Sequence, residues 1–338
     1  MNRPTASYGF SLVELMVAMT IGLIVLTVLA TVFSQTSSGR SDLERVTRLV
    51  ENSRFAADIV GDDVRHSGFY GTFMPPGDAV FTDPSPCNWN TADVTQLGWR
   101  HTVIPPEYPA PLQGWDDPVT GLAGLACLPN RVPGTDVIAI RRASSQPVAQ
   151  AAVSLTRVYV QATQCINDGV PLVVSNNSAA FTLRTAACDV ANLANIRRYL
   201  VRVYYIASCN DCAPSDGIRT LKRMEVIDNV YRVVSLAEGV ENLQFEYAFD
   251  TNDDGSPEQL LTTTTTATGT PTDRWSNVVS VRMHVLMRST ESVPAANTTP
   301  GTFDMGAGHG AETCPNGFKC RLVSTTMRLN NVAGRREP

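Results

Sequence analysis

Oxygen-bearing side chains near position 250 have a spacing that suits a calcium ion. Asp250, Asn252 and Asp254 stand at alternate positions, Gly255 follows them, and Glu258 comes three residues later. Alternate oxygens can converge on one ion, and a glycine permits the sharp turn that such a loop needs. The sequence therefore predicts a Ca2+ site whose ligands are Asp250, Asn252, Asp254 and Glu258.

The same segment also fits a simple turn. A full EF-hand loop has a bidentate glutamate where this chain has Leu261, so Glu258 or a backbone carbonyl would have to replace it. Asn, Asp and Gly are also turn-forming residues, and the segment lies between two predicted strands. A hairpin turn without an ion is the alternative, and the sequence leaves both open.

The cysteines are a second set of reactive candidates. Cys209 and Cys212 form a C-x-x-C, and His309, Cys314 and Cys320 follow later in the chain. A zinc site or a thioredoxin-like redox centre would use such residues. However, a second C-x-x-C is missing, and no βαβ pattern surrounds the first one. Because the chain has eight cysteines, an even number, structural disulfides in an oxidising compartment are favoured.

Proximity along the chain suggests how these cysteines pair, although the number of alternative connectivities is large. The predicted pairs are Cys87 with Cys127, Cys165 with Cys188, Cys209 with Cys212, and Cys314 with Cys320.

Hydrolytic and phosphate chemistry have little support, and the chain is not expected to be an enzyme. None of the four histidines stands in a hydrolase or metalloprotease motif, and no phosphate-binding glycine motif is present. His284 lies on the polar side of a predicted strand and is expected to be solvated. The net charge of −5 gives no reason to expect a nucleic-acid partner.

Among the elements that must position these residues, the first is an apolar helix. Residues 12–33 are almost wholly apolar, and Glu14 is their only charge. Their length is about that of a bilayer core, which predicts a single membrane span. A cleaved secretory signal would be shorter and would end in a small-x-small site. An acid at membrane depth is costly and therefore indicates a function for Glu14.

A helical pattern returns after a short polar segment. Apolar and small residues recur in steps of three and four, which places them on one helix face. They are Leu43, Val46, Val50, Ser53, Ala57, Val60 and Val64. One long helix is predicted, with its first half in the membrane and its second half packed on a domain.

The segment GFSLVE, residues 9–14, resembles the GFxLxE signature of type IV prepilins and type II secretion pseudopilins. The resemblance implies that a prepilin peptidase cuts between Gly9 and Phe10 and that Phe10 is then N-methylated. It also implies that Glu14 pairs with the terminal amine of a neighbouring subunit. A carboxylate in an apolar helix bundle needs a cation, and each subunit would supply one. An ordinary signal anchor with Glu14 among the lipid headgroups is the alternative.

Strand patterns dominate after residue 135. The candidates are residues 136–142, 154–162, 171–175, 197–207, 220–226, 231–236, 240–249, 276–288 and 321–329. Apolar and polar residues alternate most clearly from Val279 to Arg288, which predicts a half-buried antiparallel strand. One long helix followed by many strands predicts an α+β fold, with the helix laid against an antiparallel sheet.

Parts of the second half also resemble a known family. The runs LAEGVENLQFEYAFDTNDDG, VVSVRMHVLMRS and STTMRLNN are similar to the C-terminal part of PilW-type minor pilins, which in turn resemble J-type minor pseudopilins. The likeness covers roughly residues 199–330. Five segments are predicted: a leader (1–9), a transmembrane and assembly helix (10–34), its amphipathic continuation (35–68), an irregular loop region (69–134) and a mainly antiparallel β domain (135–338).

The resemblance implies a minor pilin that primes a type IV pilus or sits at its tip, with roles in adhesion and twitching motility. The implied partners are other minor pilins, the major pilin, the prepilin peptidase and a tip adhesin. The implied location is the inner membrane, with a periplasmic domain, before assembly and the pilus at the cell surface afterwards.

Three alternatives remain. The nearest is a J-type minor pseudopilin of a type II secretion system, and another is an unrelated signal-anchored periplasmic enzyme. The third is a tip subunit that contacts DNA or a surface through arginines on predicted strands. These are Arg141, Arg142, Arg197, Arg198 and Arg202. Alternating arginines on strands are more often solvated than used for binding.

Overall fold

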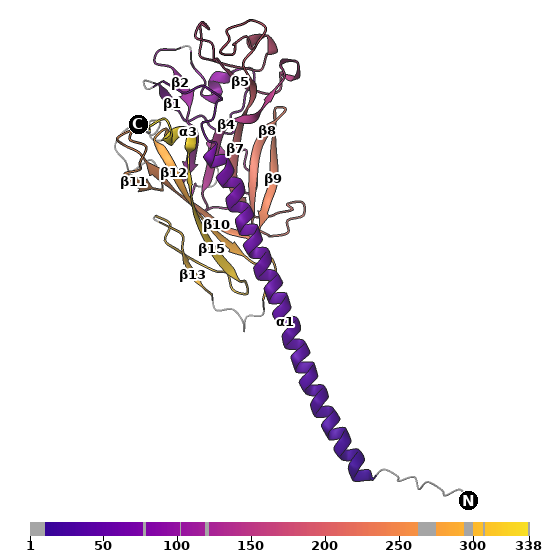
Figure 1. The fold of residues 1–338 in the computed structure, drawn as a ribbon. Helices are drawn as coiled ribbons and strands as arrows, with labels where there is room; N and C mark the ends of the chain where they lie inside the picture. The colour runs from indigo at the N-terminus through magenta and orange to yellow at the C-terminus, as the bar shows by residue number, and fades with distance from the viewer. Residues whose placement is uncertain are drawn as a thin grey trace, which may run out of the picture. The chain divides into compact units, whose positions relative to one another are not determined.

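One helix of 54 residues begins the described chain (Figure 1). The computed structural model describes residues 11–76, 79–101, 103–118, 122–262, 275–293, 300–306 and 308–336. Helix α1 runs from Leu12 to Arg65, so the polar segment after Phe33 does not interrupt it. By length and composition it can cross a membrane, and its side chains from Leu12 to Phe33 are exposed. The predicted long helix is confirmed.

Residues 1–48 and 49–338 form two separate compact units. In the second unit, the buried side of α1 consists of residues three or four positions apart, because an α-helix has about 3.6 residues per turn. These are Leu49, Ser53, Ala56, Val60 and Val64. The predicted stripe was right at three of these positions. It was wrong at Leu43 and Val46, which are 70% and 41% exposed, and it missed Leu49 and Ala56.

The larger sheet has seven strands and is antiparallel. Its long central strand β7 pairs with β4 along one edge. The other edge of β7 is shared, since β5 pairs with its first residues and β8 with its last. The strands are β3 (Leu112–Trp115), β4 (Val137–Val148), β5 (Tyr159–Ala162), β6 (Leu172–Ser175), β7 (Ile196–Ala207), β8 (Thr220–Ile227) and β9 (Val230–Glu238).

A second antiparallel sheet has four strands in the order β11-β10-β12-β15. These are β10 (Val240–Phe249), β11 (Gln259–Leu261), β12 (Val278–Arg288) and β15 (Cys320–Arg328). The apolar side of the sheet, which includes Phe245, Val281 and Met283, joins the same core as Val60 and Val64 of α1. The predicted α+β fold, with a helix against an antiparallel sheet, is confirmed.

Short elements complete the fold. β1 (Val80–Thr82) pairs in parallel with β2 (Glu107–Pro109), β13 (Thr302–Asp304) pairs with β14 (Ala311–Thr313), and helix α3 spans Asn330–Ala333. Four single-turn 3-10 helices lie at Val94–Leu97, Ala123–Leu125, Gln150–Ala152 and Ser178–Ala180. The region 69–134 therefore contains β1, β2 and β3 in addition to its loops.

The sequence located most of the longer strands. The predicted strand 240–249 has the bounds of β10, whereas the predicted strand 154–162 begins five residues too early, because residues 154–158 form a turn before β5. A tryptophan of the loop region is part of the packed interior. Trp99 is 1% exposed and contacts Tyr70, Tyr108 and Tyr199 edge-on.

Candidate functional site

The prepilin-like motif lies only partly within the described residues. Gly9 and Phe10, where cleavage and methylation are predicted, are outside them. Glu14 lies in the first turn of α1, and its side chain is exposed among exposed apolar neighbours. Within the described part of the chain, the Glu14 carboxylate has no ion-pair partner.

A second acid of α1, Asp63, is held inside the second unit, where its side chain is 1% exposed. Arg142 Nε and Arg202 Nη1 donate to its Oδ1 over 2.9 Å each, and the Tyr204 hydroxyl donates to its Oδ2. Arg142 belongs to β4, while Arg202 and Tyr204 belong to β7. These bonds fix the last turn of α1 against the two central strands of the larger sheet.

The protonation of Asp63 follows from these partners. Burial raises the pKa of its carboxyl, but Arg202, the Tyr204 hydroxyl and Arg142 lower it by more, so the pKa lies below its usual value. No motif in the sequence distinguishes Asp63 from the other acids of the helix. Its position could have identified it, because residue 63 continues the helix positions, three or four residues apart, at which Ser53, Ala56 and Val60 are buried.

Three of the four predicted calcium ligands come together. Single carboxylate oxygens of Asp250, Asp254 and Glu258 lie within 4.8 Å of one another. The Asn252 side chain instead bonds Asp254, since its Nδ2 donates to the carboxylate and its Oδ1 accepts from the N–H, each over 3.1 Å. The segment connects the antiparallel strands β10 and β11, so the hairpin alternative also describes it. Calcium binding stays a prediction.

The Asp250 carboxylate already has a cation beside it. Arg336 Nη1 lies 3.3 Å from Asp250 Oδ2 and 3.0 Å from Asp253 Oδ1. The N–H groups of Asp253 and Gly255 donate to the same carboxylate over 2.7 Å and 2.8 Å. Burial raises the pKa of Asp250, but the Gly255 N–H and Arg336 lower it by more, and the net pKa is below its usual value. Arg336 thus supplies the positive charge that an ion would bring.

Two parts of the chain match known protein families. Residues 5–30 match the prokaryotic N-terminal methylation motif. Residues 203–331 match the type IV pilus-assembly protein W family, PilW. The chain is a type IV pilus-related pilin. Both resemblances inferred from the sequence are confirmed, and the PilW match implies that the pilin interacts with other pilus components. No curated protein and no solved structure gave a significant match.

Most of the strand arginines of the pilin are engaged inside its domain. Arg141 is 1% exposed and donates to the Ala110 carbonyl and to Gln113 Oε1 over 3.1 Å and 2.8 Å. Arg142 and Arg202 bind Asp63, as described above. Structural roles account for these three residues, which weakens the DNA-contact alternative.

The prediction for His284 of the pilin was wrong. It was expected to be solvated, but it is 7% exposed. Its Nε2 lies 2.9 Å from Glu246 Oε2, and its Nδ1 lies 2.8 Å from Ser324 Oγ. Period-two alternation correctly separates the two faces of β12, but it cannot show that other strands and the loop at Gly306 cover the polar face. The contacts link the three strands β10, β12 and β15.

A further acidic group of the pilin, missed by sequence reasoning, lies beside the middle of β10. Oxygens of Asp116, Asp117 and Asp136 lie within 4.8 Å of one another. Burial strongly raises the pKa of Asp136, whose carboxylate accepts from the N–H groups of Asp117 and Phe245 over 3.0 Å and 2.7 Å. These bonds join the loop after β3 to β10, which is a structural role.

The pilin contains four disulfides. They join Cys87 to Cys127, Cys165 to Cys188, Cys209 to Cys212 and Cys314 to Cys320, the same pairs that proximity suggested. Cys209 and Cys212 are bonded to each other, so neither offers a thiolate to a metal in this state.

Proposed function

We propose that this pilin is a minor pilin that primes assembly of a type IV pilus or sits at its tip. The observation that carries the proposal is the exposed apolar helix of residues 12–33, with its unpaired Glu14, joined to a PilW-type domain. An apolar helix exposed along this length needs lipid or other helices around it. A membrane before assembly and a filament core afterwards would supply both.

Glu14 would supply the assembly contact. Cleavage after Gly9 would create an N-terminal ammonium at Phe10, and the ammonium of a neighbouring subunit would pair with the Glu14 carboxylate. In an apolar helix bundle, a carboxylate without such a partner would be strongly unfavourable. The pair would therefore favour correct register between neighbouring subunits.

The bulk of the domain favours a rare position over a repeated one. Residues 49–338 form one compact unit, which is hard to repeat along a tightly packed shaft. A priming complex or a tip needs few copies. We place the domain in the periplasm before assembly and assign the pilin a structural role, with other minor pilins, the major pilin, the prepilin peptidase and a tip adhesin as partners.

The first test is the mass of the N-terminus in cells with and without the prepilin peptidase. With the peptidase, the first residue should be N-methylated Phe10, and without it the chain should retain residues 1–9. An intact N-terminus in the presence of the enzyme, or a cut after the apolar run, would refute the prepilin assignment.

The second test separates the pilus from a secretion system. Deletion of the gene should reduce the number of surface pili and leave type II secretion unchanged. A secretion defect with normal pili would assign the pilin to the J-type alternative. Glu14→Gln should be cleaved and inserted normally but should behave like the deletion in assembly. Glu44→Gln, which changes an exposed acid of the same helix, is the matched control.

A further inference from the structure

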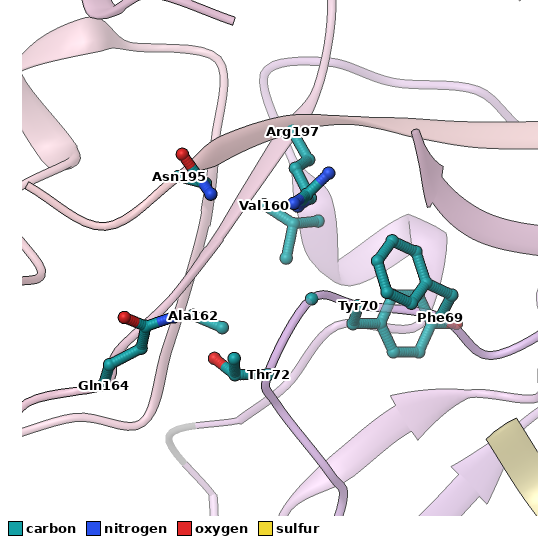
Figure 2. A pocket seen from close by; sticks show the side chains of 9 residues that line it. Phe69, Tyr70, Thr72, Val160, Ala162, Gln164, Asn195 and Arg197 are labelled. Carbon is teal, nitrogen blue, oxygen red and sulfur yellow. The ribbon is translucent and has the colours of Figure 1, made fainter. Parts of the chain in front are cut away.

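A small cavity of about 200 Å3 opens beside the chain that follows α1 (Figure 2). Its walls come from residues 69–72, from β5 and Gln164 two residues beyond it, and from Asn195 and Arg197 at the start of β7. Figure 2 shows Asn195, Gln164 and Thr72 along one side of the opening and Phe69 and Tyr70 on the other. The cavity thus has one polar wall and one aromatic wall.

Arg197 lies at this cavity and is held in a fixed orientation. Its Nη1 donates to the carbonyls of Ser144, over 3.1 Å, and Ser145. Its guanidinium carbon lies 5.4 Å from the centroid of the Phe69 ring. The remaining N–H groups, on Nε and Nη2, have no hydrogen-bond partner among the residues that the structure describes. Two donors of a planar fork are therefore available.

The charge of Arg197 is placed differently from that of several other arginines of this domain. Arg142 and Arg202 share Asp63, and Arg184 pairs with Asp168 over 2.7 Å. Within the described residues, no carboxylate lies within ion-pair distance of Arg197, although its side chain is half-buried. A partly buried guanidinium is stabilised by an anion, and a carboxylate matches its two adjacent N–H groups.

The polar wall offers groups suited to hydroxyls. In the described part of the chain, the side-chain amides of Gln164 and Asn195 have no hydrogen-bond partner, and each can both donate and accept. Thr72 also lines the cavity, but its hydroxyl already donates to the Thr163 carbonyl over 3.3 Å and can therefore only accept from a ligand. Hydroxyl groups on a ligand need paired donors and acceptors of this kind.

Gly71 lies at the cavity, beside Ala162 and Arg197. Its φ of +78° suits glycine, and a Cβ there would lie 3.8 Å from both Ala162 Cβ and Arg197 Nε. A side chain at position 71 would thus extend toward Arg197. Val160 and Ala162 provide apolar surface in the cavity, and the ring of Phe69 provides more.

We propose that this cavity binds a monosaccharide acid, with the sugar carboxylate on Nε and Nη2 of Arg197. Gln164 and Asn195 would bond the ring hydroxyls, and the aromatic wall would pack against the C–H face of the sugar. Ligand pockets for drug-sized molecules measure roughly 300–1,000 Å3, so this smaller one suits a single sugar unit. The inference goes beyond the proposed function, since the cavity lies wholly within residues 49–338 and needs neither assembly nor a tip position.

The test is ligand-observed saturation-transfer NMR on the full chain, purified in a detergent without sugar headgroups. Glucuronate is the probe, with glucose and inorganic phosphate as comparison ligands. Glucuronate should give saturation transfer, and glucose should bind about tenfold more weakly or worse, because a hydrogen bond to a charged group contributes more than a neutral one. Phosphate should compete only weakly.

Two variants and one control locate the site. Arg197→Gln should lower glucuronate affinity about tenfold or more. Asn195→Trp should block the rim, and position 195 is exposed, so this variant keeps the test valid if Arg197→Gln fails to fold. Arg232→Gln removes the same charge from an exposed position on β9 and should change nothing.

Several results would overturn the proposal. The first is no saturation transfer from glucuronate to the unaltered chain, and the second is equal binding of glucose. Unchanged glucuronate binding by folded Arg197→Gln and Asn195→Trp variants would place the ligand elsewhere. Phosphate competition as strong as that of glucuronate would indicate a general anion site and would refute the sugar-acid assignment.

Discussion

At the scale of single residues, Asp63 shows how one charge fixes a helix on a sheet. Its carboxylate is 1% exposed and binds groups from both β4 and β7. A buried ion pair is a weak source of net stability, but removal of one partner leaves the others uncompensated. The side chain therefore specifies where the last turn of α1 can lie.

Asp63→Asn should destabilise the domain by about 3–5 kcal/mol, because the Arg142 and Arg202 guanidiniums lose their shared carboxylate. Urea unfolding followed by near-UV circular dichroism measures the change. Asp58→Asn, at an exposed position on the same helix, is the matched control and should cost under about 0.5 kcal/mol.

The same residue predicts a pH dependence. Burial raises the pKa of Asp63, but Arg202, Tyr204 and Arg142 lower it below the unfolded value of about 3.9. The carboxylate then contributes its full stabilisation above about pH 4, and this is lost as pH falls through the folded pKa. The stability difference between the unaltered domain and Asp63→Asn should shrink below pH 4. A constant difference down to pH 2 would contradict the assignment.

Arg336 predicts how calcium should behave. Its guanidinium lies 3.3 Å from Asp250 Oδ2, so an ion at the Asp250 loop would have to tolerate or displace a cation. We expect weak calcium binding by the unaltered pilin and tighter binding by Arg336→Gln, measured by calorimetry and by the shift in melting temperature. Magnesium, which is smaller and dehydrates reluctantly, should have less effect. The absence of heat from both proteins in millimolar calcium would leave the hairpin turn as the explanation.

At the scale of elements, the region before β4 depends on a covalent link. Its elements β1, β2 and β3 have only three or four residues each. The disulfide between Cys87 and Cys127 closes a separation of 40 residues that contains β2 and β3. Tyr231 of β9 adds a bond from its hydroxyl to the Cys87 carbonyl over 2.6 Å. Such short strands have little stability of their own, so the cross-link limits the freedom of this region.

Replacement of Cys87 and Cys127 together by alanine should lower the free energy of unfolding by about 4 kcal/mol, on a chain-entropy argument. The paired replacement of Cys314 and Cys320, whose separation is six residues, should cost only about 2 kcal/mol. Urea unfolding under oxidising conditions compares the two. Equal losses would show that loop length does not govern the contribution of these bonds.

At the scale of the whole molecule, residues 49–338 should fold without the first 48. This unit contains the four disulfides and the core that joins α1 to both large sheets. Expressed in the periplasm, it should be monomeric and should melt in one cooperative transition. A chain that begins at residue 66 lacks Leu49, Ala56, Val60 and Val64 and should lose this transition, because the apolar faces they cover become exposed. Cooperative melting of that shorter chain would contradict the role given to α1.

The sequence alone predicts those features of the structure that depend on residues close together along the chain. The apolar run of residues 12–33 is contiguous, so composition was enough to predict the helix, and the contiguous motif around Glu14 carried the resemblance to prepilins. Local strand patterns located β10 and β12 for the same reason, and short separations suggested all four cysteine pairs.

Contacts between distant segments were decided only by the tertiary structure. Asp63 meets Arg202 across 139 positions, and Asp250 meets the C-terminal Arg336, yet neither residue differs locally from a solvated acid. Alternation along β12 predicts that His284 is exposed, but Glu246, Ser324 and the loop at Gly306 cover it. Arg197 borders a cavity because β5 and β7 pair beside residues 69–72. Periodicity states which face of an element a side chain occupies, whereas the packing of other elements decides what that face meets.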